Sequence, residues 1–270
     1  MERQKTKIAM TVAGSDSGGG AGIQADLKTF AALGAFGVSA ITCVTSQNPN
    51  IVSDVVKIPS ESVQKQIETI LDYFPVAAMK TGMLFSKDII TAIANTISKK
   101  KNFLFVLDPV MIATSGAELL QKDASEALQK SLFPLADVIT PNLDEAGFLL
   151  ETKIRTVNDM KSAITKLVSK FQVPFLLKGG HLEDSHSEDI LDFYFDGNDL
   201  TEYVYPRVKN VHTHGTGCTF SSAITAKLAL GEKIQDAITH ARQYLQNSLT
   251  QSLNLGTTHT SLNHFPEGIV

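Results

Sequence analysis

The chain has 270 residues, 43% of them hydrophobic, and its 28 acidic residues outnumber its 24 basic residues to give a net charge of −4. Because no block of basic residues occurs, binding to nucleic acid is not expected, and no apolar run reaches the roughly 18 residues that a membrane-spanning helix needs. The two cysteines, Cys43 and Cys218, form no disulfide or metal-ligand pattern, which together with the lack of a secretory signal predicts a reducing, cytoplasmic compartment.

Short apolar runs alternate with amphipathic stretches along the chain. The expected strands cover residues 8–13, 38–45, 51–58, 76–80, 103–107, 137–140, 174–178, 190–195 and 201–208. The expected helices cover residues 23–33, 60–73, 88–98, 123–131, 156–171, 219–230 and 232–249. This alternation predicts an α/β fold around a mostly parallel sheet, in a single domain spanning 1–270. The weakly alternating strand 51–58 is expected to form an exposed strand or flap.

Unusual polar and glycine-rich segments follow many of the expected strands. These segments are residues 14–22, 46–48, 81–83, 108–110, 141–145 and 178–181. Because ligands of parallel α/β sheets bind at the carboxyl ends of the strands, we expect the segments to form one site. The clustering alone does not identify the chemistry of that site.

The first of these segments contains Gly20-Ala-Gly22-Ile-Gln-Ala25, which matches the dinucleotide fingerprint G-x-G-x-x-[GA]. A nicotinamide site also needs an acidic residue near the end of the second strand, and no Asp or Glu occurs between Leu27 and Ser53. We therefore interpret the glycines as a backbone wall beside a small ligand. Asp26 either reaches that ligand or is simply a first-turn carboxylate favoured by the helix dipole.

A second glycine segment, residues 212–222, precedes the helix expected near the C-terminus. Its backbone N–H groups at residues 215–218, together with the helix dipole, would bind a phosphate or a developing oxyanion. The helix N-terminus also favours a thiolate, so the pKa of Cys218 is expected to lie below the free value of about 8.5. The alternative is a glycine loop with a buried, unreactive cysteine.

Two carboxylates follow neighbouring strands. Asp108 ends one strand, and Glu145 lies three residues after Asn142 in a pattern that also predicts the start of a helix. A pair of carboxylates opposite a phosphate site would suit Mg²⁺. Lys178, at the end of another strand, is either a phosphate contact or a solvated edge residue.

Two roles of Cys218 are open. As a nucleophile it would need a histidine base, for which His212 or His214 could serve. As a general base it would accept the proton of a substrate hydroxyl that attacks the γ-phosphate of a nucleotide. The second role also uses the two carboxylates and Lys178, so phosphoryl transfer is favoured.

These motifs together resemble the hydroxymethylpyrimidine/phosphomethylpyrimidine kinases of thiamin biosynthesis, in the ribokinase-like superfamily. The matching segments, in chain order, are residues 14–28, 79–84, 108–111, 140–146, 178–180 and 214–221. The resemblance implies a three-layer α/β/α sandwich with a small β flap, often in a homodimer. It implies ATP and Mg²⁺, and phosphorylation of 4-amino-5-hydroxymethyl-2-methylpyrimidine and then of its monophosphate.

The resemblance also implies roles for individual residues. The anion hole would consist of Gly215, Thr216, Gly217 and Cys218, with Cys218 as the base. The metal side would be formed by Asp108 and Glu145, and the nucleotide side by Asn142 and Lys178. The pyrimidine pocket would be lined by Gly14, Asp26, Gln47, Met83 and Val110.

Gln47 distinguishes between related substrates. An aminopyrimidine offers an amine donor and a ring-nitrogen acceptor, and one carboxamide can bind both. Relatives that act on pyridoxal commonly carry Met at this position, so Gln47 favours the pyrimidine. The alternative is a pyridoxal or pyridoxine kinase of the same fold. A sensor that binds the ligand without catalysis would have lost the base or the metal side, and Cys218, Asp108 and Glu145 are all present.

Overall fold

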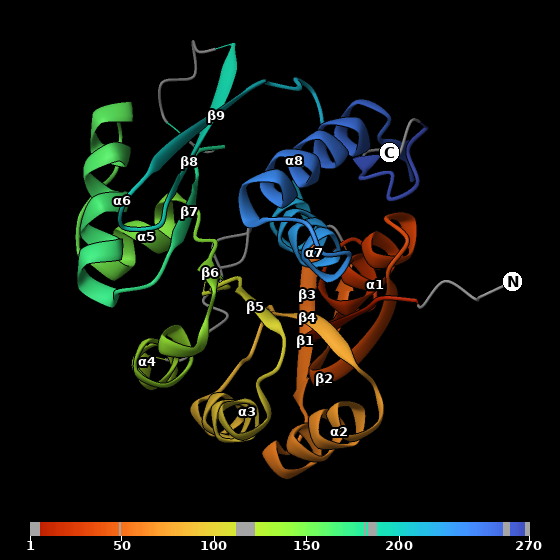
Figure 1. Cartoon of the computed structure of the whole chain (residues 1–270). Coiled ribbons are helices and arrows are strands. Elements are labelled where there is room, and N and C mark those ends of the chain that lie inside the picture. Colours follow the sequence, from red (N-terminus) through yellow and green to blue (C-terminus); the bar gives the residue numbers. More distant parts are fainter. Residues whose placement is uncertain are drawn as a thin grey trace, which may run out of the picture.

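A computed structural model describes residues 6–48, 50–111, 122–180, 182, 188–255 and 260–267. Within these residues, a nine-stranded sheet has the order β3-β2-β1-β4-β5-β6-β7-β8-β9 (Figure 1). The strands are β1 (Ile8–Asp16), β2 (Phe36–Asn48), β3 (Ile51–Lys57), β4 (Val76–Thr81), β5 (Leu104–Leu107), β6 (Val138–Ile139), β7 (Phe175–Lys178), β8 (Asp189–Phe195) and β9 (Leu200–Pro206). The six central strands, β2, β1, β4, β5, β6 and β7, run parallel. At the edges, β3 on one side and β8 and β9 on the other pair antiparallel with their neighbours.

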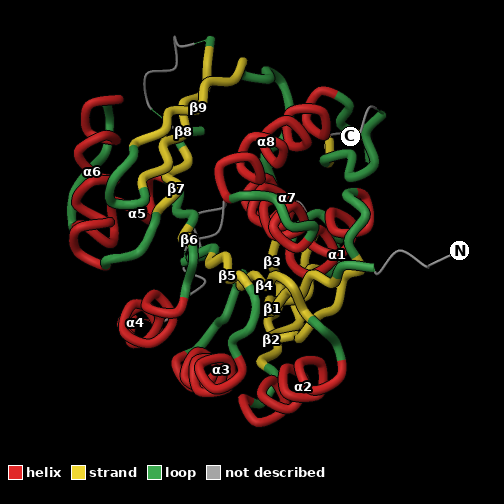
Figure 2. The backbone as a smooth tube through the Cα atoms, viewed as in Figure 1, coloured by secondary structure: helices red, strands yellow, loops and turns green. Residues whose placement is uncertain are grey.

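Helices cover both faces of the sheet, as Figure 2 shows. One face packs against α1 (Gly22–Ala32), α7 (Thr216–Ala229) and α8 (Ile234–Thr250). The other face packs against α2 (Ser60–Tyr73), α3 (Lys87–Lys100), α4 (Lys122–Ala127), α5 (Leu143–Leu150) and α6 (Val157–Phe171). Strand β1 shows why two cores form, since Met10 and Val12 point into the second core and Ala9 into the first. The expected three-layer sandwich is confirmed.

The two expected edge structures are part of the main sheet. Strand β3 pairs with β2, so the segment expected as a flap extends the sheet edge, with Ile51 and Val56 exposed. Strands β8 and β9 form the expected hairpin and continue the sheet from β7. None of the helices in the described ranges is long and apolar enough to cross a membrane.

Several element boundaries differ from the sequence prediction. Helix α7 begins at Thr216 rather than 219, because Gly215 adopts a positive φ of 82° and serves as the N-cap. Helix α5 follows Asn142 and confirms the helix start that the spacing to Glu145 indicated. Helix α4 ends at Ala127, within the expected helix 123–131. A π-helical turn follows over Leu128–Leu132, and a 3-10 turn over Phe133–Leu135.

Candidate active site

The N-terminus of α7 contacts the glycine segment before α1. Gly215 is required there: a Cβ atom at this position would lie 1.9 Å from the carbonyl oxygen of Gly20, and the φ of 82° is itself unfavourable for other residues. The Thr216 hydroxyl donates to the carbonyl of Thr213 at 2.8 Å and fixes the turn. The two glycine segments that the sequence singled out therefore form one wall of the site.

The first turn of α7 also faces two charged side chains. A Cβ at Gly217 would lie 3.5 Å from Lys178 Nζ and 3.9 Å from Asp108 Oδ2. Helix N-terminus, ammonium and carboxylate therefore meet at the carboxyl edge of the sheet, as predicted from three separate segments. Unpaired N–H groups and a cation form the kind of environment that binds phosphate.

Asp108 lies at the centre of this edge and is only 3% exposed. Its carboxylate accepts hydrogen bonds from Lys178 Nζ at 2.9 Å, from Thr140 Oγ1 at 3.2 Å and from Ser221 Oγ at 3.1 Å. Burial opposes ionisation, but the charges of Lys178 and Lys80 outweigh it and hold the pKa of Asp108 below its ordinary value. The group is therefore a carboxylate at neutral pH.

Glu145 is the second carboxylate of the site, and it also caps the N-terminus of α5. It completes a capping box, in which its Oε2 accepts the Asn142 N–H at 2.8 Å and Asn142 Oδ1 accepts the Glu145 N–H at 2.8 Å. Burial, reinforced by the nearby charge of Asp108, raises the pKa of Glu145 to about 7, although Lys178 acts in the opposite direction. Asn142 also forms a β-bridge with Lys178, which brings the nucleotide-side residues together.

The expectation that the pKa of the Cys218 thiol lies below 8.5 is wrong. Instead of falling below 8.5, the pKa of Cys218 is raised to about 11. Burial is the largest cause, and the carboxylates of Asp26 and Asp108 add to it, while Lys80 and the backbone of Gly22 act in the opposite direction. The sequence revealed the helix N-terminus but not the burial and the carboxylates that outweigh it.

The predicted pyrimidine pocket has a sulfur-rich side. A Cβ at Gly14 would lie 2.8 Å from Cys43 Sγ and 3.6 Å from Met83 Sδ, so the bare backbone of Gly14 faces both side chains. Val110 is partly buried just after β5, where its N–H donates to the Asp108 carbonyl at 2.9 Å. Gly14 and Met83 are thus brought together, and Val110 lies beside the charged edge.

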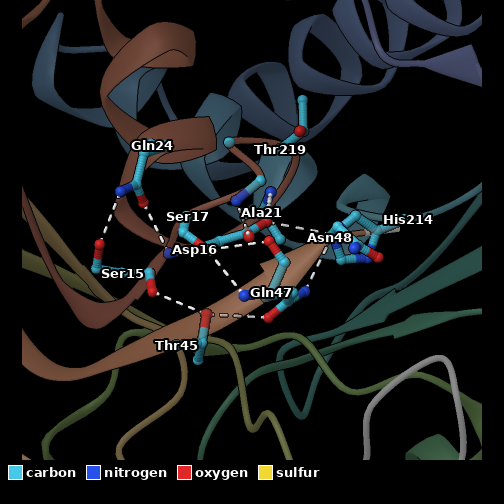
Figure 3. A network of polar contacts seen from close by, with 12 residues as sticks. Ser15, Asp16, Ser17, Ala21, Gln24, Thr45, Gln47, Asn48, His214 and Thr219 are labelled. Carbon is cyan, nitrogen blue, oxygen red and sulfur yellow. Dashed lines mark hydrogen bonds and ion pairs between the residues drawn. The ribbon is translucent and has the colours of Figure 1, made fainter. Parts of the chain in front are cut away.

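Gln47 belongs to a polar network at the end of β2 (Figure 3). Its Oε1 accepts from Thr45 Oγ1 at 3.2 Å, and its Nε2 lies 3.4 Å from His214 Nε2. The same ring nitrogen lies 3.3 Å from Asp16 Oδ2, and Asp16 also accepts the N–H groups of Gly18 and Ala21 at 2.8 Å. Burial opposes ionisation of Asp16, but His214 and these backbone donors lower its pKa. The network fixes the Gln47 carboxamide next to the α7 turn.

Asp26 lies deeper than expected. Its carboxylate is 0% exposed, and both oxygens have protein partners: Thr11 Oγ1 at 2.6 Å on one, Lys80 Nζ at 3.0 Å and Ser222 Oγ at 2.6 Å on the other. In the described contacts its oxygens bind the interior rather than the pocket. A direct substrate contact by Asp26 remains a prediction.

Sequence reasoning missed two side chains that the fold places at or beneath the site, Asp16 and Lys80. Both lie in segments that carried the family resemblance, but neither spacing nor residue type marked them individually. His214 was considered only as a base for a Cys218 nucleophile, and in the structure its ring nitrogen lies within hydrogen-bonding distance of Asp16 and Gln47. No cluster of three or more potential metal-ligating His, Cys, Asp or Glu side chains occurs among the described residues.

Comparison with known proteins gives a consistent result. A family model for phosphomethylpyrimidine kinase matches residues 16–263. A hydroxymethylpyrimidine/phosphomethylpyrimidine kinase of Haemophilus influenzae is 46% identical over 263 residues, which cover 96% of this chain and 97% of that protein. The structure of a phosphomethylpyrimidine kinase from Clostridium difficile is 40% identical, with a TM-score of 0.79 over 90% of this chain and 98% of that chain.

The fold is also similar to that of pyridoxal kinases, with a higher TM-score and a lower sequence identity than for the phosphomethylpyrimidine kinase structure. A pyridoxal kinase of Staphylococcus aureus in complex with AMP-PCP and pyridoxal is 34% identical, with a TM-score of 0.87 over 98% of this chain and 95% of that chain.

Proposed function

The chain belongs to the phosphomethylpyrimidine kinase family, and from this premise we propose that it transfers the γ-phosphate of ATP to 4-amino-5-hydroxymethyl-2-methylpyrimidine and then to the monophosphate. The observation that carries the proposal is the meeting of the α7 turn, Lys178 and Asp108 at the carboxyl edge of the sheet. Phosphoryl transfer needs little covalent chemistry from the protein, so positioning and charge stabilisation at one point are what the site must supply.

In the proposed reaction the backbone N–H groups of residues 215–218 hold the transferred phosphoryl group. The thiolate form of Cys218 accepts the proton of the substrate hydroxyl and becomes a thiol as the hydroxyl oxygen attacks phosphorus, and ADP leaves with the electron pair of the broken P–O bond on the opposite side. Lys178 stabilises the charge that develops on the phosphate oxygens. Because burial raises the pKa of the free thiol to about 11, the rate is expected to increase with pH through the neutral range.

Mg²⁺ is the cofactor that we propose for this site. Mg²⁺ commonly uses one or two carboxylates together with phosphate oxygens and water. Asp108 and Glu145 provide such hard oxygen donors, and the charge of Asp108 opposes the ionisation of Glu145, which a bound cation would favour. The fit is therefore good: bound Mg²⁺ would neutralise phosphate charge, and Asp108 and Glu145 would be the residues that hold it.

Gln47 supports a pyrimidine as the substrate, with its carboxamide already oriented by Thr45 and His214. A site that hydrogen-bonds its substrate discriminates strongly against a ligand that leaves those groups unpaired. The pyridoxal kinase alternative keeps the same catalytic edge and differs at this pocket.

A substrate panel tests the proposal. ADP release is measured with the aminopyrimidine alcohol, its monophosphate and pyridoxal, each with ATP and Mg²⁺. We expect turnover of both pyrimidine species. Turnover of pyridoxal alone would replace the proposal with a vitamin B6 kinase.

We also propose, on the resemblance alone, that residues 1–270 act as one kinase domain, that two copies associate as a homodimer, and that the enzyme works in the cytoplasm. Light scattering after gel filtration tests the dimer, since a monomeric mass at assay concentrations contradicts it.

A further inference from the structure

A fully buried ion pair lies beneath the active site. Lys80 and Asp26 are both 0% exposed, and Lys80 Nζ donates to Asp26 Oδ1 at 3.0 Å. Thr11 and Ser222 complete the cluster through hydroxyl bonds of 2.6 Å each to the two oxygens of Asp26. Well-packed apolar residues commonly stabilise a core as well as or better than a buried ion pair does, so such a pair is weak evidence for a purely structural role.

Four elements converge on this cluster. Lys80 on β4 lies directly opposite Thr11 on β1 in the sheet register, so both side chains point to the same face. Asp26 comes from α1 and Ser222 from α7, the two helices that cover this face beside each other. The tertiary structure, not the local sequence, assembles the group.

The cluster is aligned with the Cys218 thiol. On α7, Cys218 precedes Ser222 by four residues, and on α1, Gly22 precedes Asp26 by four residues, so each pair lies on one helix face. The backbone N–H of Gly22 hydrogen-bonds the Cys218 sulfur, and Asp26 bonds Ser222 one helical turn further along. Ser222, which bonds Asp26 of the ion pair, therefore lies about one turn, roughly 5 Å along the helix axis, from Cys218.

We propose that Lys80 is a positioning residue for the phosphoryl transfer: its ammonium group, held by Asp26, stabilises the negative charge on the Cys218 sulfur when the thiol releases its proton. The proposal rests on the proposed role of Cys218 as the base. It gives the buried ion pair a function: Asp26 holds the ammonium group of Lys80 in place through a hydrogen bond of 3.0 Å, which an oxygen acceptor at this position can provide with or without a charge.

The charged groups near the thiol come from each element packed around it. Lys80 on β4 and Lys178 at the end of β7 favour the thiolate, whereas Asp26 on α1 and Asp108 after β5 oppose it. Among the charged neighbours of Cys218, Lys80 has the largest influence. The two members of the ion pair thus act on the thiol with opposite sign, and this makes the proposal testable.

The test measures thiol reactivity in the unliganded chain. The rate of alkylation of Cys218 by iodoacetamide is followed by mass spectrometry as a function of pH. We expect Lys80→Met to slow alkylation about tenfold or more at a given pH, and Asp26→Asn to accelerate it by a factor of about three to ten. Damage to the fold alone would expose the thiol and shift both variants in the same direction.

Thr11→Val is the matched control, since it removes one hydrogen bond of the same cluster without changing a charge. Its alkylation profile is expected to stay within about a factor of two of the parent. If Lys80→Met is too unstable to measure, Lys80→Met combined with Asp26→Leu replaces the pair by apolar side chains and is still expected to slow alkylation. Unchanged profiles in the charge variants would overturn the proposal.

This experiment separates the inference from the function. Alkylation needs neither ATP nor a pyrimidine, so it reports on Lys80 and Cys218 even if the substrate assignment fails. In the kinase assay, Lys80→Met is expected to lower kcat more than it raises KM and to move the rise of rate with pH to higher pH. A variant that keeps the parental kcat profile contradicts the link to catalysis.

Discussion

The molecule contains two lysine–aspartate pairs that are chemically alike and differ in access. In the Asp26–Lys80 pair, Nζ lies 3.0 Å from Oδ1 and both side chains are fully buried. In the Asp108–Lys178 pair, Nζ lies 2.9 Å from Oδ1 and the lysine side chain is 14% exposed. The enclosed pair has its partners within the protein, and the edge pair faces the open first turn of α7. The comparison shows that the position relative to the sheet edge, and not the residue types, decides whether such a pair is fully buried or accessible to a ligand.

Both pairs influence the Cys218 thiol electrostatically, and removing this residue is expected to have the largest effect. Cys218→Ala should lower kcat by roughly 10²–10⁴-fold, the usual contribution of a general base, while nucleotide binding persists. Cys218→Ser is the matched variant of similar size. Its activity is also expected to fall, because a neutral hydroxyl at this position is a much weaker base than a thiolate. If the variants react as fast as the parent in single-turnover assays, Cys218 is not the general base. The two lysine–aspartate pairs would then have no common role in activating it.

The enclosed pair should matter most for stability. Lys80→Met leaves the Asp26 carboxylate buried without its cation and is expected to reduce the free energy of unfolding by about 3–5 kcal/mol. Urea unfolding of Lys80→Met and Lys178→Met measures the contrast. The two variants losing equal stability would show that enclosure does not distinguish the pairs.

The edge pair should matter most for turnover. Lys178→Met removes a cation beside the proposed phosphate site and is expected to lower kcat/KM about 10²–10³-fold. Its loss of stability should be smaller than that of Lys80→Met, because the Lys178 side chain is partly exposed and the charge of Lys80 still favours the Asp108 carboxylate. Steady-state kinetics at saturating Mg²⁺ provide the measurement, and retention of activity would place the transferred phosphate elsewhere.

Gln47 lies away from both pairs, so its replacement should change selectivity with little effect on either. Gln47→Met is expected to reduce kcat/KM for the aminopyrimidine about 10–10²-fold relative to pyridoxal, since the pyrimidine loses its hydrogen-bonding partner. Thr45→Val serves as the control that loosens the carboxamide without removing it. A selectivity ratio that does not move would exclude Gln47 as the specificity residue.

The smallest expected effect concerns Glu145, beside the edge pair. Burial raises its pKa from 4.5 to about 7, so the folded chain holds this proton more tightly than the unfolded chain. Its contribution to stability is therefore fully present below pH 4.5 and is lost as pH rises through 7. Comparing the parent with Glu145→Gln should isolate a loss on the order of 1–3 kcal/mol across this window. Parallel stability curves would show that Glu145 titrates normally.

The sequence predicted the sheet edge and most of the site, because each signal was local. The glycines before α1, Asp108 after β5 and Lys178 at the end of β7 mark the ends of parallel strands, and the glycines before α7 mark the start of a helix. The capping pattern of Asn142 and Glu145 also predicted α5 correctly. Element boundaries were less certain, and the start of α7 moved by three residues because the conformation of Gly215 decides it.

What the sequence by itself determined is the fold class and the set of residues that meet at the carboxyl edge of the sheet, since periodicity and strand-end motifs are properties of neighbouring residues. The tertiary structure alone decided the environment of each group. It enclosed Asp26 with Lys80 and raised the pKa of Cys218 against the sequence expectation. Burial and charge act through space, and the side chains concerned come from strands and helices up to about two hundred residues apart, as Asp26 and Ser222 do.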